Sequence, residues 1–161
     1  MSDVVERASD PALDVLLPDA DYADAFALTV PGALGAGDAA RRAFGSMPPW
    51  ITRLMAARNL LVTPFGLRTS APAGSRISRI GVFPVISADE RRVVLGFPDR
   101  HLDFRVVIAT KPERGRTLIT VTTLVRTHNA LGRAYLACIM PFHRLIVPAL
   151  LRQVRAPHDR S

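Results

Sequence analysis

Six polar side chains of the kinds used in proton transfer and anion binding gather at two points of the sequence. They are His101, Asp103 and Arg105 at the first point, and Arg126, His128 and Asn129 at the second. A histidine beside an arginine can move a proton and hold a carboxylate or enolate oxygen. The sequence therefore offers His101 and His128 as candidate proton carriers and Arg126 as the candidate oxyanion partner.

The same residues also have structural and metal-binding interpretations. Asn129 can cap a helix that begins after it, and Asp103 can pair with Arg126 on the surface of a sheet. A metal site would combine His101, His128 and Asp103, two histidines and one carboxylate. No short ligand spacing supports that set, and the neighbouring arginines disfavour a cation. We therefore expect no metal and, since no glycine-rich dinucleotide motif is present, no cofactor.

Alternating apolar residues predict a first strand near 22–30 and four later strands within 81–87, 91–97, 102–109 and 117–126. Hairpins about 98–101 and 112–115 would pair Leu95 with Phe104 and Val106 with Val121. Residues paired across a ladder share a face, so this register places every apolar set on one side. It also brings the two polar clusters to the same end of the sheet.

Helical spacing predicts short helices over 38–44 and 49–62 and a long amphipathic helix over 130–155. Pro141 and Pro148 each remove a backbone hydrogen bond of the long helix and should bend it. A curved antiparallel sheet wrapped around a long C-terminal helix is an α+β helix-grip fold. Such a fold often encloses a cavity between the sheet and the helix.

The chain has 161 residues and a net charge of +7, and its acidic residues are concentrated before residue 40. We expect a loose acidic arm over 1–20, a single helix-grip domain over 21–156 and a tail over 157–161. The basic residues are spaced singly rather than clustered with stacking aromatics, which disfavours nucleic-acid binding.

Further features indicate the cellular environment of the protein. The single Cys138 excludes an internal disulfide, and its place on an apolar helix face predicts a buried thiol. Residues 131–151 are hydrophobic but contain Arg133, His143 and Arg144, which disfavours a membrane-spanning helix. The first ten residues are acidic and do not form a signal peptide. We expect a cytoplasmic protein, and a homodimer stays an open alternative.

Three strings resemble the bacterial domain-of-unknown-function family 2867. They are DRHLDFR at 99–105, RTHNALGRAYL at 126–136 and PFHRLIV at 141–147. The resemblance implies membership of the START/polyketide-cyclase-like (SRPBCC) superfamily, whose members typically hold an apolar ligand between the sheet and the C-terminal helix. The family has no established reaction, so the resemblance assigns no catalytic residue.

These observations predict a domain that binds an apolar or amphipathic small molecule. The expected pocket is lined by Trp50, Phe83, Phe104, Tyr135, Ile139 and Phe142, with Arg126, His128 and Arg133 at its polar end. Two alternatives stay open: an acid–base enzyme of cyclase or hydratase type in the same cavity, and a non-catalytic protein-interaction module. Whether the protein is an enzyme is left undecided by the sequence.

Overall fold

The computed structural model describes residues 3–65, 78–98 and 100–155. Its strands are β1 (Val5–Arg7), β2 (Tyr22–Pro31), β3 (Arg79–Ile80), β4 (Phe83–Ala88), β5 (Arg92–Pro98), β6 (Leu102–Glu113) and β7 (Arg116–Thr127). They form one sheet in the order β1-β2-β7-β6-β5-β4-β3, and every neighbouring pair is antiparallel. The tail expected at 157–161 lies outside the described residues.

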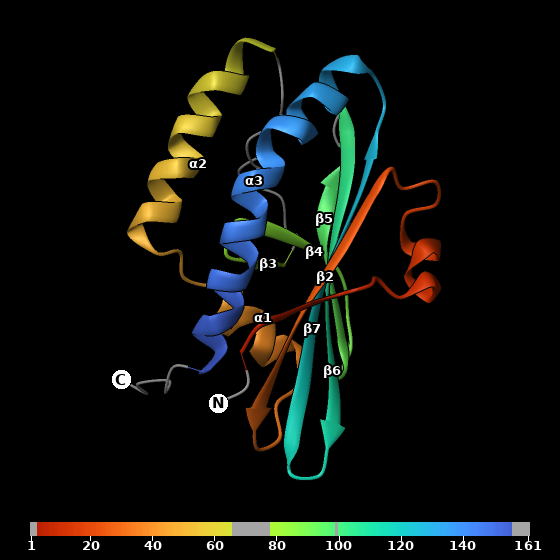
Figure 1. Cartoon of the computed structure of the whole chain (residues 1–161), viewed down its shortest axis with the longest axis vertical. Helices are drawn as coiled ribbons and strands as arrows, with labels where there is room; N and C mark the ends of the chain where they lie inside the picture. The colour runs from red at the N-terminus through yellow and green to blue at the C-terminus, as the bar shows by residue number, and fades with distance from the viewer. Residues whose placement is uncertain (1–2, 66–77, 99, 156–161) are drawn as a thin grey trace.

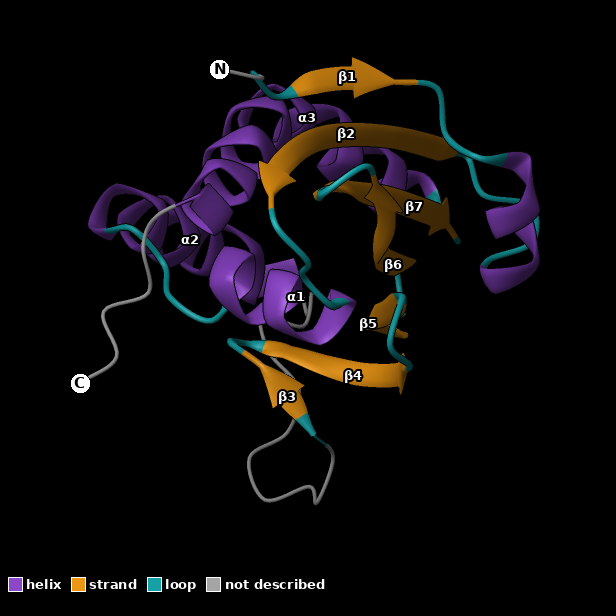
Figure 2. Ribbon diagram, turned by 90° about the horizontal axis from the view of Figure 1, so that it is seen from below, coloured by secondary structure: helices purple, strands orange, loops and turns teal. Residues whose placement is uncertain are grey.

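Three α-helices lie on one side of this sheet. They are α1 (Ala36–Phe44), α2 (Pro49–Val62) and α3 (Ala130–Arg152), and the short 3-10 helices η2 (Thr63–Phe65) and η3 (Gln153–Arg155) continue α2 and α3. The sheet curves around α1 and α3, while α2 lies further out beside α3 (Figures 1 and 2). This is the α+β helix-grip fold that the sequence predicts.

The predicted strand faces are confirmed, but the predicted register is wrong by two residues. Leu95 pairs with Val106, Phe104 with Val125 and Ile108 with Val121. The β6–β7 hairpin closes through Arg114 and Gly115, whose φ angles of 44° and 76° are both positive. A two-residue turn of this kind matches the twist of the strands. Because it replaces the four-residue loop predicted at 112–115, each residue of β6 pairs with a residue of β7 two positions later than predicted. A shift of two residues preserves the face of every side chain.

Each face of the sheet carries its own apolar core. The face under the helices buries Phe26, Leu28, Leu95, Ile108 and Val121 against α1 and the C-terminal part of α3. The opposite face buries a smaller cluster of Val94, Val107 and Leu124 beneath Leu13 and Leu17.

The N-terminal arm is more ordered than expected. Val5–Arg7 pair with β2, and Pro11–Leu16 form the 3-10 helix η1 on the side of the sheet away from α3 (Figure 1). Leu13 and Leu17 are buried there, so apolar contacts hold the arm across the sheet. The expectation of a loose arm is therefore wrong for this segment.

The helices α2 and α3 differ in how much they contribute to the core. Ile51 is the one fully buried residue among the described side chains of α2. In α3, Val147, Leu150 and Leu151 are buried, whereas Gly132 is the only buried residue before them. The segment Ala130–Arg155 is long and apolar enough to cross a membrane, with a mean hydropathy of 1.6 over a stretch of which only 17% is buried.

Candidate functional site

An apolar cavity of about 420 Å³ lies between α2 and α3. Its wall on the α2 side is formed by Leu54, Met55, Ala57, Arg58 and Leu61, together with Phe65 of η2. Its wall on the α3 side is formed by Leu131, Ala134, Tyr135, Cys138, Ile139, Phe142 and Ile146. We call this space the α2–α3 cavity. Its volume falls within the range of small-molecule pockets, about 300–1,000 Å³.

The cavity is not where the sequence led us to expect it. No described strand residue lines it, because the residues on the inner face of the sheet pack into the core with α1 and the end of α3. Phe83 and Phe104 belong to that packing, and their rings meet edge to face at 6.0 Å. The space lies instead on the outer side of α3, where α2 stands beside it.

Arg58 and Tyr135 join the two walls across the cavity. The Nε of Arg58 donates a hydrogen bond of 2.6 Å to the Tyr135 hydroxyl. The guanidinium carbon also lies 5.3 Å from the centre of the Tyr135 ring, within the range of a cation–π contact. Arg58 is the only charged side chain among the residues that line the cavity. The pair therefore gives an otherwise apolar wall one polar, positively charged feature.

One end of the cavity is held by His101, which is buried at the start of β6. Its Nε2 lies 3.1 Å from the carbonyl oxygen of Phe65, at the end of α2 and η2. Its Nδ1 lies 2.9 Å from the side-chain nitrogen Nδ2 of Asn129, the residue that caps α3. Asn129 Oδ1 accepts a hydrogen bond from Gly132 N, as predicted for a helix cap. His101 thus connects the ends of both cavity walls.

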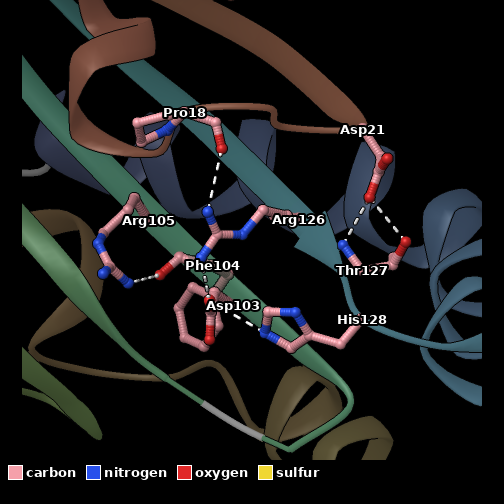
Figure 3. Close-up of polar contacts among 8 residues, drawn as sticks. All are labelled: Pro18, Asp21, Asp103, Phe104, Arg105, Arg126, Thr127 and His128. Carbon is pink, nitrogen blue, oxygen red and sulfur yellow. Dashed lines mark hydrogen bonds and ion pairs between the residues drawn. The ribbon is translucent and has the colours of Figure 1, made fainter.

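The other polar residues of the predicted cluster meet on the opposite face of the sheet. Asp103 Oδ2 lies 2.9 Å from a terminal nitrogen of Arg126 and 3.0 Å from His128 Nε2 (Figure 3). Arg126 also donates to the carbonyl oxygen of Pro18 in the N-terminal arm. Asp103 is buried, and Arg126 lies directly opposite it in the ladder rather than diagonally. This cluster pins the arm to the sheet and does not reach the α2–α3 cavity.

A neighbouring contact holds the start of β2 to the end of β7. Asp21 accepts hydrogen bonds of 2.6 Å from the hydroxyl and from the backbone N–H of Thr127 (Figure 3). These bonds, the hydroxyl bond first, lower the pKa of Asp21 below its ordinary value of 3.8, because they stabilise the ionised carboxylate.

A further polar group lies between α3 and the sheet. His143 Nε2 is 2.9 Å from Asp24 Oδ2, and the Tyr22 hydroxyl donates a hydrogen bond of 2.8 Å to the same oxygen. Burial and the bond to Asp24 raise the pKa of Tyr22 to about 12. His143 does not line the cavity, since it points to the sheet while Phe142 and Ile146 face α2. The group attaches the middle of α3 to β2.

The structure therefore brings together only part of the predicted pocket. Tyr135, Ile139 and Phe142 line the α2–α3 cavity. Phe83 and Phe104 pack against the core, Trp50 and Arg133 are exposed, and Arg126 and His128 lie across the sheet. Cys138 is exposed in the cavity wall rather than buried, because the apolar arc that carries it faces α2 and not the sheet.

The main residues that sequence reasoning missed are on α2. Leu54 and Leu61 are seven residues apart and so share one face of the helix predicted over 49–62, but periodicity does not say which neighbour that face meets. Arg58 could have been found only from a weak signal, because it is a single arginine that follows Leu54 by four residues and so lies on the same side of a largely apolar helix.

No group of three metal-binding side chains is found within the described part of the chain. Among the residues that line the cavity there is no histidine, aspartate or glutamate. The arrangement can enclose an apolar molecule, and Tyr135, Cys138 and Arg58 are its only titratable groups.

Comparisons with known proteins assign the family but no activity. A conserved protein from Geobacillus kaustophilus is similar in structure, with a TM-score of 0.42 and 10% identity over 83% of this chain and 93% of that one. CalU16 from Micromonospora echinospora has a TM-score of 0.33 and 11% identity over 96% of this chain and 90% of that one. No curated protein matches the sequence. The family described as Protein of unknown function (DUF2867) matches residues 16–150, and the chain belongs to that family.

Proposed function

We propose that the protein binds an apolar small molecule, or the apolar part of an amphipathic one, in the α2–α3 cavity. The observation that carries this proposal is a cavity of about 420 Å³ whose wall is apolar apart from Arg58 and the hydroxyl of Tyr135. A pocket of that size and composition gains free energy when an apolar ligand replaces water along its wall.

The construction of α2 supports the same proposal. Its sequence is apolar on most of its circumference, yet Ile51 is its only fully buried residue among the described side chains. A helix that is apolar all round is normally covered on several sides. A ligand in the cavity would cover the side formed by Leu54, Ala57 and Leu61, which the folded chain leaves open.

Acid–base catalysis in this cavity has less support. The candidate carriers His101 and His128 lie outside it, and both are engaged with neighbouring groups. A general acid or base must be within hydrogen-bond reach of the substrate proton, directly or through one water. Among the described lining residues, only the Tyr135 phenol and the Cys138 thiol offer a proton.

The cavity has a chemical probe, because Cys138 lines it and is the only cysteine of the chain. We expect linear fatty acids or multi-ring aromatic compounds to slow the alkylation of Cys138 by a maleimide. Native mass spectrometry should show the corresponding complex. Unchanged alkylation together with no bound species across both compound classes would refute the proposal.

A matched pair of variants separates the cavity from the rest of α3. Ala134 lines the cavity and Ala137 does not, although both are exposed residues of the same helix. Ala134→Trp should fill the space and abolish binding, whereas Ala137→Trp should bind as the wild type does. Equal binding by both variants would place the ligand elsewhere.

A further inference from the structure

The α2 and α3 helices expose a concentration of large apolar side chains. They are Trp50, Leu60, Leu61 and Phe65 from the α2–η2 segment and Phe142 and Leu145 from α3. Leu60 and Leu145 are 79% and 65% exposed, which is unusual for leucine. We call the surface that carries these six residues the α2–α3 face. A large exposed apolar surface of this kind normally marks an interaction site.

Helical spacing sets a basic residue within the apolar stripe of α2. Trp50, Arg53, Ala57 and Leu61 follow one another at intervals of three, four and four residues, so they lie along one side of the helix. All four are exposed. Tryptophan is enriched at the headgroup level of membranes, and an exposed stripe that combines it with leucine and arginine can place apolar side chains and a positive charge there together.

The charge of the two helices has a single sign. Residues 49–65 and 130–155 contain six arginines and no aspartate or glutamate. Arg53 is exposed within the stripe of α2, and Arg58 lies in the cavity wall beside Tyr135. The other four are Arg133, Arg144, Arg152 and Arg155, of which Arg152 is paired with Asp3. Anionic headgroups attract basic residues that lie near a bilayer surface.

The acidic arm is divided between two places. The segment η1, with Asp10 before it and Asp14 within it, covers the opposite face of the sheet from α3 (Figures 1 and 2). Asp3, at the start of the arm, lies instead near the C-terminal end of α3, where its Oδ1 is 3.8 Å from Arg152 Nε. The carboxylates of η1 therefore lie across the sheet from the α2–α3 face and do not repel an anionic surface there.

A second copy of the chain fits this face less well. A symmetric dimer places the same patch of both copies in contact. Here it would bring Arg53 of one copy near Arg53 of the other, on helices that carry no acidic residue, and like charges brought together at an interface oppose association. An anionic bilayer instead supplies both an apolar layer for Leu60 and Leu145 and phosphate groups for Arg53.

We infer that the α2–α3 face docks the protein on the surface of an anionic lipid bilayer. The exposed leucines and Trp50 enter the boundary between headgroups and acyl chains, and Arg53 contacts lipid phosphates. The helix α3 lies along the surface, because Val147, Leu150 and Leu151 hold its C-terminal part in the core. Leu61, Phe65 and Phe142 both line the cavity and are exposed, so the α2–α3 cavity opens toward the bilayer.

Vesicle binding tests this inference directly, because Trp50 is the only tryptophan of the chain and lies on the docking face. We expect the full chain to co-sediment with phosphatidylcholine vesicles that contain phosphatidylglycerol and not with pure phosphatidylcholine. The emission of Trp50 should shift to the blue and be quenched by lipid-linked quenchers. Added salt should weaken the binding.

Matched variants identify the face. Leu60→Glu and Leu145→Glu should each weaken vesicle binding at least tenfold, while Val15→Glu should not change it. Val15 is also an exposed apolar residue, but it lies on η1 across the sheet. Arg53→Gln should weaken binding about fivefold, the effect of one basic residue near the surface.

Several results would overturn the inference. They are the absence of binding to anionic vesicles, equal binding to neutral and anionic vesicles, and an equal loss for Val15→Glu. A dimer in light scattering that Leu60→Glu dissociates, without vesicle binding, would instead show that a second copy covers the face. Docking does not depend on a cavity ligand, so Ala134→Trp, which fills the cavity, should still bind vesicles.

Discussion

The side-chain amide nitrogen of Asn129 lies 2.9 Å from His101 Nδ1, and this contact determines which ring nitrogen carries the proton. Asn129 Oδ1 already accepts a hydrogen bond from Gly132 N, so the group that faces the ring is the amide donor. His101 Nδ1 must then accept, and Nε2 carries the hydrogen that is donated to the carbonyl of Phe65. One neutral imidazole therefore links the ends of α2 and α3.

We expect nitrogen NMR of the histidine rings to show His101 as the Nε2–H tautomer. Replacing His101 by alanine should lower the free energy of unfolding by about 1–3 kcal/mol, because it removes the two hydrogen bonds that this buried ring makes with Phe65 and Asn129. His128→Ala is the control, with an expected loss of about 0–1 kcal/mol for a partly exposed pair. An Nδ1–H tautomer, or equal losses in the two variants, would contradict this assignment.

Replacing each of two helical glycines by alanine should change the free energy of unfolding in opposite directions. A Cβ at Gly132 would lie 2.1 Å from the carbonyl oxygen of His101, whereas a Cβ at Gly37 would meet only the end of the Arg41 side chain at 3.4 Å. Gly37→Ala should stabilise the protein by about 0.5–1 kcal/mol through helix propensity. Gly132→Ala should destabilise it, since backbone must move at the start of α3. Urea denaturation measures both, and a stabilising Gly132→Ala would show that α3 can shift away from His101.

Replacing both Asp24 and His143 should cost less stability than replacing His143 alone. His143→Leu should destabilise the protein by about 1–3 kcal/mol, because it removes the imidazole that lies 2.9 Å from the buried carboxylate of Asp24. The double variant Asp24→Leu/His143→Leu should recover most of that loss, since replacing both partners of a buried polar pair by apolar side chains leaves neither group unsatisfied. Denaturant unfolding of both variants is the measurement. Additive losses would mean that the two side chains do not act as a pair.

Asp21 predicts a pH dependence of stability. Its pKa is lowered in the folded protein from an ordinary value of 3.8, so its contribution is complete above that pH and is lost as the pH falls through the lower, folded value. Asp21→Asn should therefore have a lower melting temperature than the wild type at neutral pH, and the difference should shrink in acid. Thr127→Val, which removes the hydroxyl bond, should shift the acid transition upward. A difference that does not change with pH would contradict the role of the charge.

The sequence contained enough information for the fold because strand faces follow from side-chain alternation. Leu95, Val106 and Val121 were placed on the inner face, and all three are buried there. The register was wrong by two residues, since parity is unchanged by such a shift and the turn at Arg114 and Gly115 decides it. A glycine in a hairpin signals a turn but does not give its length.

The site was less predictable, because it depends on how separate elements approach one another. Tyr135, Ile139 and Phe142 were correctly placed on an apolar arc of α3, but the partner of that arc is α2 rather than the sheet. Likewise, nothing in the spacing of Asp24 and His143 relates them, since they are 119 positions apart and meet only when α3 crosses β2. Patterns within one element identify a face, and the neighbour of that face is set by the tertiary structure.

The small share of the core that α2 supplies has a consequence for the adaptability of the protein. Apart from Ile51, the described side chains of this helix are not fully buried, so exchanging them costs little folding free energy. Leu54, Ala57 and Leu61 can then be replaced to reshape one wall of the α2–α3 cavity while the sheet, α1 and the end of α3 keep the domain intact. Under the proposed function, the residues that decide which ligand fits are thus separate from the residues that maintain the fold.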